Sequence, residues 1–381
     1  MAILITGIGE LTTNDPELGR RREAALVLDG ERIAWVGSAS APPAADERVD
    51  VGGRAVLPGW VDSHTHLVFA GDRTAEFEAR MSGNPYTAGG IAVTVEATRA
   101  ATDTELAANL SRLVAEAVRQ GTTCLETKTG YGLTVSDEVR SARIAAEAVD
   151  EVTFLGAHVV PPGVDGERYV DLVSGEMLAA VADSVRWVDV FCEQGAFDEA
   201  RSERVLRAAL GAGLGVRVHG NQLGPGPGVQ LAVRLGAASV DHCTHLTDQD
   251  LEALSGSDTV ATLLPACDLS TRHPLAPARR LLDAGAVIAL ASNANPGSSY
   301  TTSMAFCVTT AVLQMGLSVE EAVWAATAGG ARALRREDVG VIRVGARADV
   351  HVLDAPGITH LAYRPGVPLT WAVWRRGVKM T

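Results

Sequence analysis

The stretch RAALGAGLGVRVHGN (207–221) contains the sequence pattern that decides the fold. An Ala/Leu-rich segment typical of a helix ends at glycines, a short β-branched run follows, and the run stops at polar residues. Glycine at the end of a helix and a β-branched run directly after it are typical of the boundary between a helix and the next strand. The stretch therefore predicts a helix followed by a short buried strand.

The same pattern recurs at residues 115–128, 231–243 and 281–293. Short apolar runs that end in polar residues number eight: VLPGWVDSHTH, TTCLETK, VTFLGAH, VDVFCE, GVRVHGN, SVDHC, ATLLPACD and VIALASN. Eight strands alternating with helices are the count of a (β/α)8 TIM-type barrel. A doubly wound open sheet is the competing architecture, but no glycine-rich phosphate-binding fingerprint follows the first strand.

Both ends of the chain are β-rich. AALVLDGERIAWVG (24–37) contains two β-runs around an Asp-Gly pair, which is a strong hairpin signal. GARADVHVLD (345–354) and LTWAVWRRGVKM (369–380) are also typical of strands. We expect residues 1–56 and 341–381 to form a small β-sandwich domain together, and residues 57–340 to form the barrel domain.

Composition and charge narrow the class of protein. The 381 residues are 47% hydrophobic and 21% charged, as in soluble globular proteins, and the formal net charge of −13 argues against a nucleic-acid partner. No stretch reaches the length of a membrane helix, and the N-terminus lacks the features of a signal peptide. The five cysteines are widely spaced and include no C-x-x-C pair. We therefore expect a cytoplasmic protein without a membrane partner.

Histidines gather at the predicted strand ends, where barrel enzymes place their functional side chains. His64 and His66 end the first strand, and His158, His219 and His242 end later ones. Residues two apart on an extended segment point the same way, so the first two imidazoles can share one cation. With His219 they would make a three-histidine site for Zn²⁺ or a related metal. Such a cation generates hydroxide near neutral pH, which predicts a hydrolase.

Longer motifs resemble one family. LPGWVDSHTH and the later histidines are similar to the amidohydrolase superfamily, and HTHLVFAGDR, ETKTGYGL, TFLGAHVVPP, VFCEQGAF, SVDHCTHL and NPGSSYTTSM resemble imidazolonepropionase. The resemblance covers nearly the whole chain. It implies hydrolysis of the cyclic amide 4-imidazolone-5-propionate to N-formimino-L-glutamate, a step of histidine degradation, with one bound zinc or iron ion. It also implies a homodimer.

The resemblance implies roles for individual residues. His64, His66 and His219 match metal ligands, and His242 matches the residue that orients water or polarises the ring carbonyl. Arg73 matches a substrate-binding arginine, and a bidentate guanidinium suits a propionate carboxylate. The other implied substrate contacts are Tyr131, His158, Gln222, Asn295, Gly297 and Ser298.

The residue at the end of the eighth strand departs from the family pattern. The family has an aspartate there that binds metal and carries a proton, whereas this chain has Asn293. An amide oxygen can approach a cation, but the amide cannot accept and return a proton at neutral pH.

Several interpretations of Asn293 stay open. It is a planned substitution, or a natural change in which Asp241 or Asp268 takes over, or a drift toward another cyclic amide or toward binding with little or no turnover. The neighbouring Ser292 and Ala294 also depart from the family and favour natural drift.

Lys128 and Lys379 are the only lysines. Some members of the superfamily bridge two metal ions with a carboxylated lysine, and Lys128 lies beside a predicted strand end. The surrounding motif resembles the one-metal family, so we expect a mononuclear site and a structural or peripheral Lys128.

Overall fold

The computed structural model describes residues 1–83 and 90–381. Its largest sheet has eight parallel strands that neighbour one another in chain order. They are β8 (Trp60–Asp62), β9 (Thr122–Lys128), β10 (Glu151–Ala157), β11 (Trp187–Cys192), β12 (Gly215–Gly220), β13 (Ser239–His242), β14 (Val260–Leu263) and β15 (Ile288–Leu290). An isolated parallel bridge between Thr65 and Asn293 joins the ends of the first and last strands. The predicted strands and the (β/α)8 barrel are confirmed.

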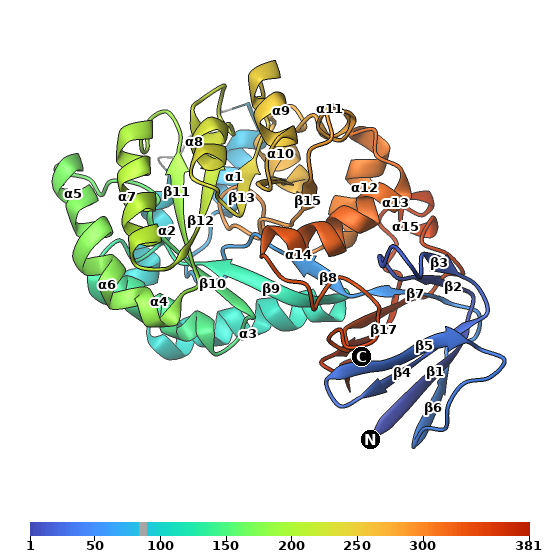
Figure 1. Cartoon of the computed structure of the whole chain (residues 1–381). Helices are drawn as coiled ribbons and strands as arrows, with labels where there is room; N and C mark the ends of the chain where they lie inside the picture. The colour runs from blue at the N-terminus through green and yellow to red at the C-terminus, as the bar shows by residue number, and fades with distance from the viewer. Residues whose placement is uncertain (84–89) are drawn as a thin grey trace.

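Helices surround this barrel on the outside (Figure 1). The longest, α3 (Asp103–Arg119), buries an apolar stripe that includes Leu106, Leu110 and Leu113. The other helices are α1 (Thr74–Met81), α2 (Ile91–Ala100), α4 (Val135–Ala146), α5 (Gly166–Leu172), α6 (Leu178–Val181), α7 (Glu199–Gly211), α8 (Gly228–Arg234), α9 (Asp248–Ser255), α10 (Pro265–Thr271), α11 (Ala278–Asp283), α12 (Met304–Gln314), α13 (Val319–Trp324), α14 (Gly330–Ala333) and α15 (His360–Tyr363).

The stretch 207–221 folds as its sequence predicts. Helix α7 ends at Gly211, and Gly213 takes a φ of +78°, a conformation that glycine adopts without strain. Strand β12 then pairs in parallel with β11 and β13. Arg217 and His219 are two residues apart on this strand, so they share one face of the sheet.

Both chain ends form a separate pair of sheets. The four-stranded sheet has the order β5 (Arg32–Ser38), β4 (Ala24–Asp29), β1 (Ala2–Ile8), β6 (Glu47–Asp50). The six-stranded sheet has the order β18 (Val378–Lys379), β17 (Thr370–Arg375), β16 (Val350–Leu353), β7 (Ala55–Pro58), β2 (Glu10–Thr12), β3 (Arg20–Arg21).

One hydrophobic cluster joins these two sheets. It contains Ile5 and Leu26 from the first sheet and Val352 and Trp374 from the second, so the sheets pack face to face as a small β-sandwich. The predicted hairpin is confirmed, because β4 and β5 pair in antiparallel register up to Asp29 and Arg32. Figure 1 shows both termini at this end of the molecule.

The cysteines are buried and make no disulfide. Burial raises the pKa of the Cys243 thiol well above its usual range, and that of Cys267 to about 12. Both are therefore neutral packing residues, as the sequence predicts. Among the described residues, no helix is long and apolar enough to cross a membrane.

Candidate metal centre and substrate cavity

Four imidazoles converge at the C-terminal end of the barrel strands. His64 and His66 follow β8, His219 lies in β12, and His242 ends β13. The Nε2 atoms of His64 and His66 lie 3.3 Å apart. One ring nitrogen from each of His64, His219 and His242 lies within 4.8 Å of the other two. The structure thus brings the predicted metal histidines together and adds His242 as a fourth imidazole.

Carboxylates behind the imidazoles determine which ring nitrogen of each histidine is free to bind a cation. Asp241 Oδ2 lies 2.7 Å from His64 Nδ1, and Asp189 Oδ2 lies 3.1 Å from His219 Nδ1. Burial would raise the pKa of Asp241, but Arg217 and His64 hold it well below its usual range. The ionised carboxylate accepts the Nδ1 proton of His64, which leaves the Nε2 lone pair for a cation.

The donor set fits a metal ion. Burial lowers the pKa of His64 and His66 well below the usual range, so both rings are neutral at pH 7. Neutral imidazoles with converging Nε2 atoms and carboxylates behind them are the arrangement that Zn²⁺ and related metals prefer.

An open cavity lies over the histidines. It is lined by His66, Arg73, Ile91, Tyr131, His158, Val159, Phe191, Ala196, His219, Gln222, His242, Asn293, Asn295 and Ser298. Two predicted site residues are not in this wall: His64 lies fully buried beneath it, and Gly297 lies behind Arg73. The lining residues that the structure describes include no carboxylate, so the wall suits an anionic ligand.

Arg73 is the permanent cation of the cavity wall. Its Nε lies 2.7 Å and its Nη2 2.6 Å from Glu76 Oε2. A Cβ added at Gly297 would lie 2.3 Å from Arg73 Nη1, so the glycine lets the 295–299 turn pack directly on the guanidinium. Arg80, which the sequence analysis missed, donates from Nη2 to the Gly297 carbonyl at 2.7 Å and holds that turn.

Substituting Gly297→Ala should raise KM for a carboxylate substrate by about 10-fold or more with little change in kcat. The new methyl group displaces the Arg73 guanidinium, and a charge-assisted hydrogen bond contributes roughly 1.5–3 kcal/mol. Steady-state kinetics measure the two constants. Gly224→Ala is a matched control because a Cβ there meets open space. An unchanged KM in Gly297→Ala would contradict the placement of the carboxylate at Arg73.

His158 and Gln222 contribute polar groups to the same wall. Burial lowers the pKa of His158 to about 4, and its Nδ1 donates to the Gly130 carbonyl at 3.0 Å. The neutral ring is left with Nε2 as an acceptor. The Gln222 backbone N–H donates to Glu193 Oε1 at 2.6 Å. Glu193, another residue that the sequence analysis missed, thus holds the loop that carries Gln222.

Asn293 lies directly beside the His64–His66 segment. Its backbone N–H donates to the His64 carbonyl at 3.0 Å, and its carbonyl accepts from the His66 N–H at 3.2 Å. Its side-chain Nδ2 donates to Ser298 Oγ at 2.8 Å. Its φ of +69° is one that Asn and Asp tolerate better than other side chains do. The Asn293 backbone is therefore bonded to both His64 and His66, and its uncharged side chain lines the cavity.

The two carboxylates considered as replacements lie elsewhere. Asp241 is bound to His64 and Arg217 beneath the histidines. Asp268 accepts from Thr244 Oγ1 at 2.9 Å and from the Ala276 N–H at 3.1 Å. The structure brings neither carboxylate into the cavity wall.

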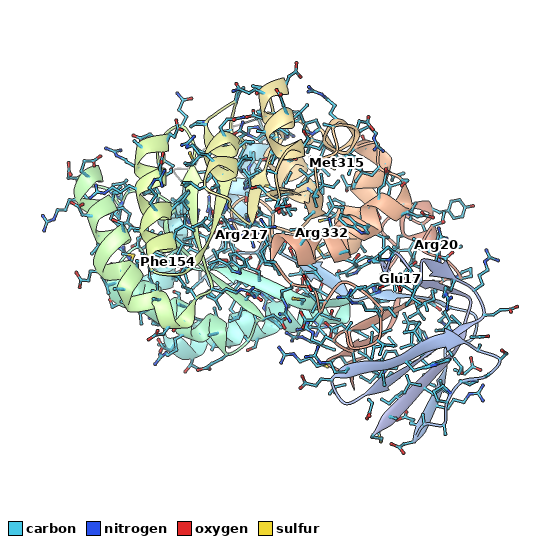
Figure 2. The ribbon with its side chains drawn as sticks, viewed as in Figure 1. Glu17, Arg20, Phe154, Arg217, Met315 and Arg332 are labelled. Atoms are coloured by element: carbon cyan, nitrogen blue, oxygen red, sulfur yellow. The ribbon has the colours of Figure 1, made fainter. Side chains whose placement is uncertain are left out.

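A layer of buried charges lies beneath the histidines. Its members are all fully buried: Glu126, Lys128, Asp189, Arg217 and Asp241. Lys128 Nζ lies 2.9 Å from Glu126 Oε1 and 3.0 Å from Asp189 Oδ2. Arg217, labelled in Figure 2, enters this layer from β12.

Lys128 therefore lies within the buried layer beneath the histidines, which fits a structural role. A carboxylated lysine would place a further negative charge among these carboxylates. The expectation of a mononuclear site stays a prediction.

Comparison with known proteins shows the family to which the chain belongs. Residues 229–372 match the amidohydrolase family. The imidazolonepropionase of Saccharopolyspora erythraea is 73% identical over 382 residues, which cover 99% of this chain and 98% of the relative. That of Arthrobacter sp. (strain FB24) is 65% identical over 398 residues and covers 100% of both chains. A crystal structure of a triazine hydrolase variant shares the fold with a TM-score of 0.78, at 19% identity over 99% of this chain and 94% of that one. The chain belongs to the imidazolonepropionase family of amidohydrolases, hydrolases that act on C–N bonds in cyclic amides.

Proposed function

We propose that this chain opens the ring of 4-imidazolone-5-propionate to give N-formimino-L-glutamate, with one zinc or iron ion per chain. The observation that carries the proposal is the placement of Arg73 and the converging imidazoles in one cavity whose described wall has no carboxylate. Arg73 pairs with the propionate carboxylate, and the ring then lies toward the histidines. The two relatives at 73% and 65% identity are both named imidazolonepropionase, which favours turnover of the substrate over binding alone.

His64, His66 and His219 are the proposed metal ligands, through their Nε2 atoms. Asn293 is the proposed fourth, because its Nδ2 donates to Ser298 and its oxygen remains for the cation. When bound, the ion supplies an activated water and polarises the ring carbonyl. Imidazole ligands accept either zinc or iron.

The other residues hold and orient the substrate. His242 has a ring nitrogen within 4.8 Å of those of His64 and His219, where it stabilises negative charge on the carbonyl oxygen. Asn295 Oδ1 accepts from the Gly297 N–H at 2.8 Å and keeps the turn against Arg73. Tyr131, His158, Gln222 and Ser298 complete the proposed substrate contacts, and Gly297 supports Arg73 from behind.

Removal and replacement of the metal test this proposal. Protein treated with a chelator should lose ring opening, measured as the loss of ring absorbance. Zn²⁺ or Fe²⁺ should restore it at one ion per chain, and the ion that gives the higher kcat identifies the better cofactor. Full activity in chelated, metal-free protein would contradict a metal-dependent reaction.

We further propose that the protein is a cytoplasmic homodimer. Phe306 and Leu313 on α12 are 44% and 54% exposed, and Tyr363 on the adjacent α15 is 77% exposed, which supports a contact surface there. Free, buried cysteines fit a reducing compartment. Sedimentation velocity tests the dimer, and a monomer at all concentrations would contradict it. The division into residues 1–56 with 341–381 and residues 57–340 stays our proposal for the domains.

A further inference from the structure

We propose that Lys128 is a resident cation that fills the position of a second metal ion and so limits the centre to one. The inference rests on the metal site of the proposed function. It concerns a lysine that makes no contact with the cavity but lies directly beneath it.

The position of the ammonium group is that of a cation held by carboxylates. Lys128 Nζ lies 2.9 Å from Glu126 Oε1, 3.0 Å from Asp189 Oδ2 and 3.8 Å from Asp241 Oδ2. Asp189, His219 and Asp241 form a second donor group, whose ligand atoms lie within 4.8 Å of one another. The ammonium lies within ion-pair distance of both carboxylates of that group. A side chain of the protein therefore occupies the place where a second ion would find its ligands.

The balance of buried charge explains why a cation is needed there. Glu126, Asp189 and Asp241 bring three carboxylates into a layer that water does not reach, and Lys128 and Arg217 bring two cations. Arg217 forms its ion pair with Asp241, at 3.1 Å. In the described part of the chain, Glu126 and Asp189 have no other Lys or Arg within ion-pair distance. Without the ammonium group, the two buried carboxylates of Glu126 and Asp189 would lack a cation, and a cation from solution would bind in its place.

Lys128 also acts on the histidines through its partners. Asp189 Oδ1 accepts the His219 backbone N–H at 3.2 Å, and its Oδ2 faces both the His219 ring and the ammonium. Asp241 faces the His64 ring and the ammonium in the same way. Lys128 is therefore a positioning residue, since it reaches the metal ligands only through these two carboxylates.

The number of Zn²⁺ ions per chain tests the inference. Native protein and the variants Lys128→Met and Lys128→Arg are equilibrated with excess Zn²⁺, passed through a desalting column and analysed for zinc by mass spectrometry. We expect one ion in the native protein, one in Lys128→Arg, which keeps the charge, and two in Lys128→Met. Lys379→Met is the matched control, because Lys379 is the only other lysine and its side chain is exposed. It should bind one ion.

The outcomes separate this inference from the proposed function. A native protein without zinc would contradict the metal site itself. One ion in both native protein and folded Lys128→Met would overturn only the role of Lys128, because a merely structural lysine changes stability and not stoichiometry. If Lys128→Met does not fold, Lys128→Gln replaces it. Failure of both to fold in excess Zn²⁺ would also overturn the inference, because a divalent ion would then not substitute for the ammonium.

Discussion

Replacing Asn293 with aspartate should raise kcat for ring opening by about 10²–10⁴-fold. The leaving ring nitrogen must receive a proton, and a carboxylate can take one from water and deliver it, whereas an amide cannot. Asn293 lines the cavity and its backbone is bonded to both His64 and His66, so the new carboxylate would face the reacting groups.

The surrounding structure accommodates this change. Aspartate has the same shape as asparagine and tolerates the φ of +69°. Ser298 Oγ now accepts from Asn293 Nδ2, and its own hydroxyl proton can turn to donate to a carboxylate instead. Because Arg73 is untouched, KM should change little. The variant should therefore fold normally and differ mainly in the chemical step.

Kinetics at matched metal content provide the measurement. Asn295→Asp is the control, because it introduces the same charge two residues away, on a side chain that holds the 295–299 turn. Only Asn293→Asp should gain rate, and its kcat/KM should acquire an acid limb as the new carboxylate becomes protonated. If native protein is as fast as Asn293→Asp, another group carries the proton and the amide does not limit turnover.

The barrel and the site histidines could be predicted because their signals are local. Each strand is a short apolar run after a glycine, and parallel strands place their C-terminal ends at one face of the barrel. His64 and His66 share a direction by the period of an extended chain. The family motifs supplied the remaining contacts, and the structure places most of them in one wall.

The sequence analysis named Lys128 and Asp241 but missed the buried layer of charges to which they belong. The sequence does contain one indication of that layer. Arg217 lies two residues before His219, and Glu126 lies two before Lys128, each on a predicted buried strand. A charge in a buried strand with the same parity as a site residue must face the same interior. What no spacing reveals is which carboxylate pairs with which cation, because the partners come from different strands and meet only in the closed barrel.

A second unpredicted feature joins the barrel to the sandwich. Asp150 lies just before β10, and its side chain is fully buried. It accepts from Arg347 Nη1 at 2.5 Å, Arg375 Nη2 at 2.9 Å and Arg376 Nη2 at 3.0 Å. Arg375 ends β17, Arg376 follows it and Arg347 precedes β16. All three lie about 200 residues from Asp150 in the sequence, so local pattern could not pair them. Burial would raise the pKa of Asp150, but Arg347 and Arg375 hold it well below its usual range.

Substituting Asp150→Asn should lower the free energy of unfolding by roughly 3–5 kcal/mol at pH 7. The change removes the carboxylate that the buried guanidinium of Arg347 shares with the partly buried one of Arg375. Thermal and urea unfolding measure the loss. Asp354→Asn is the control: Asp354 pairs with Arg54 at 2.9 Å, but its side chain is 61% exposed, so the loss should stay below about 1 kcal/mol. Equal losses of unfolding free energy in the two variants would contradict a special role for the ion pairs of Asp150.

The pH dependence of that difference gives a second, independent check. A carboxylate with a lowered folded-state pKa stabilises the fold above its unfolded pKa of about 3.9, and this stabilisation is lost as pH falls through the folded value. Asparagine does not titrate, so the difference in unfolding free energy between native protein and Asp150→Asn should be constant from pH 7 to about 5 and shrink below about 4.

The ion pairs of Asp150 lie near Thr123 at the start of β9, at the end of the barrel opposite the histidines. Metal content and kcat of the folded variant should therefore match those of the native protein, which separates a loss of stability from damage to the site.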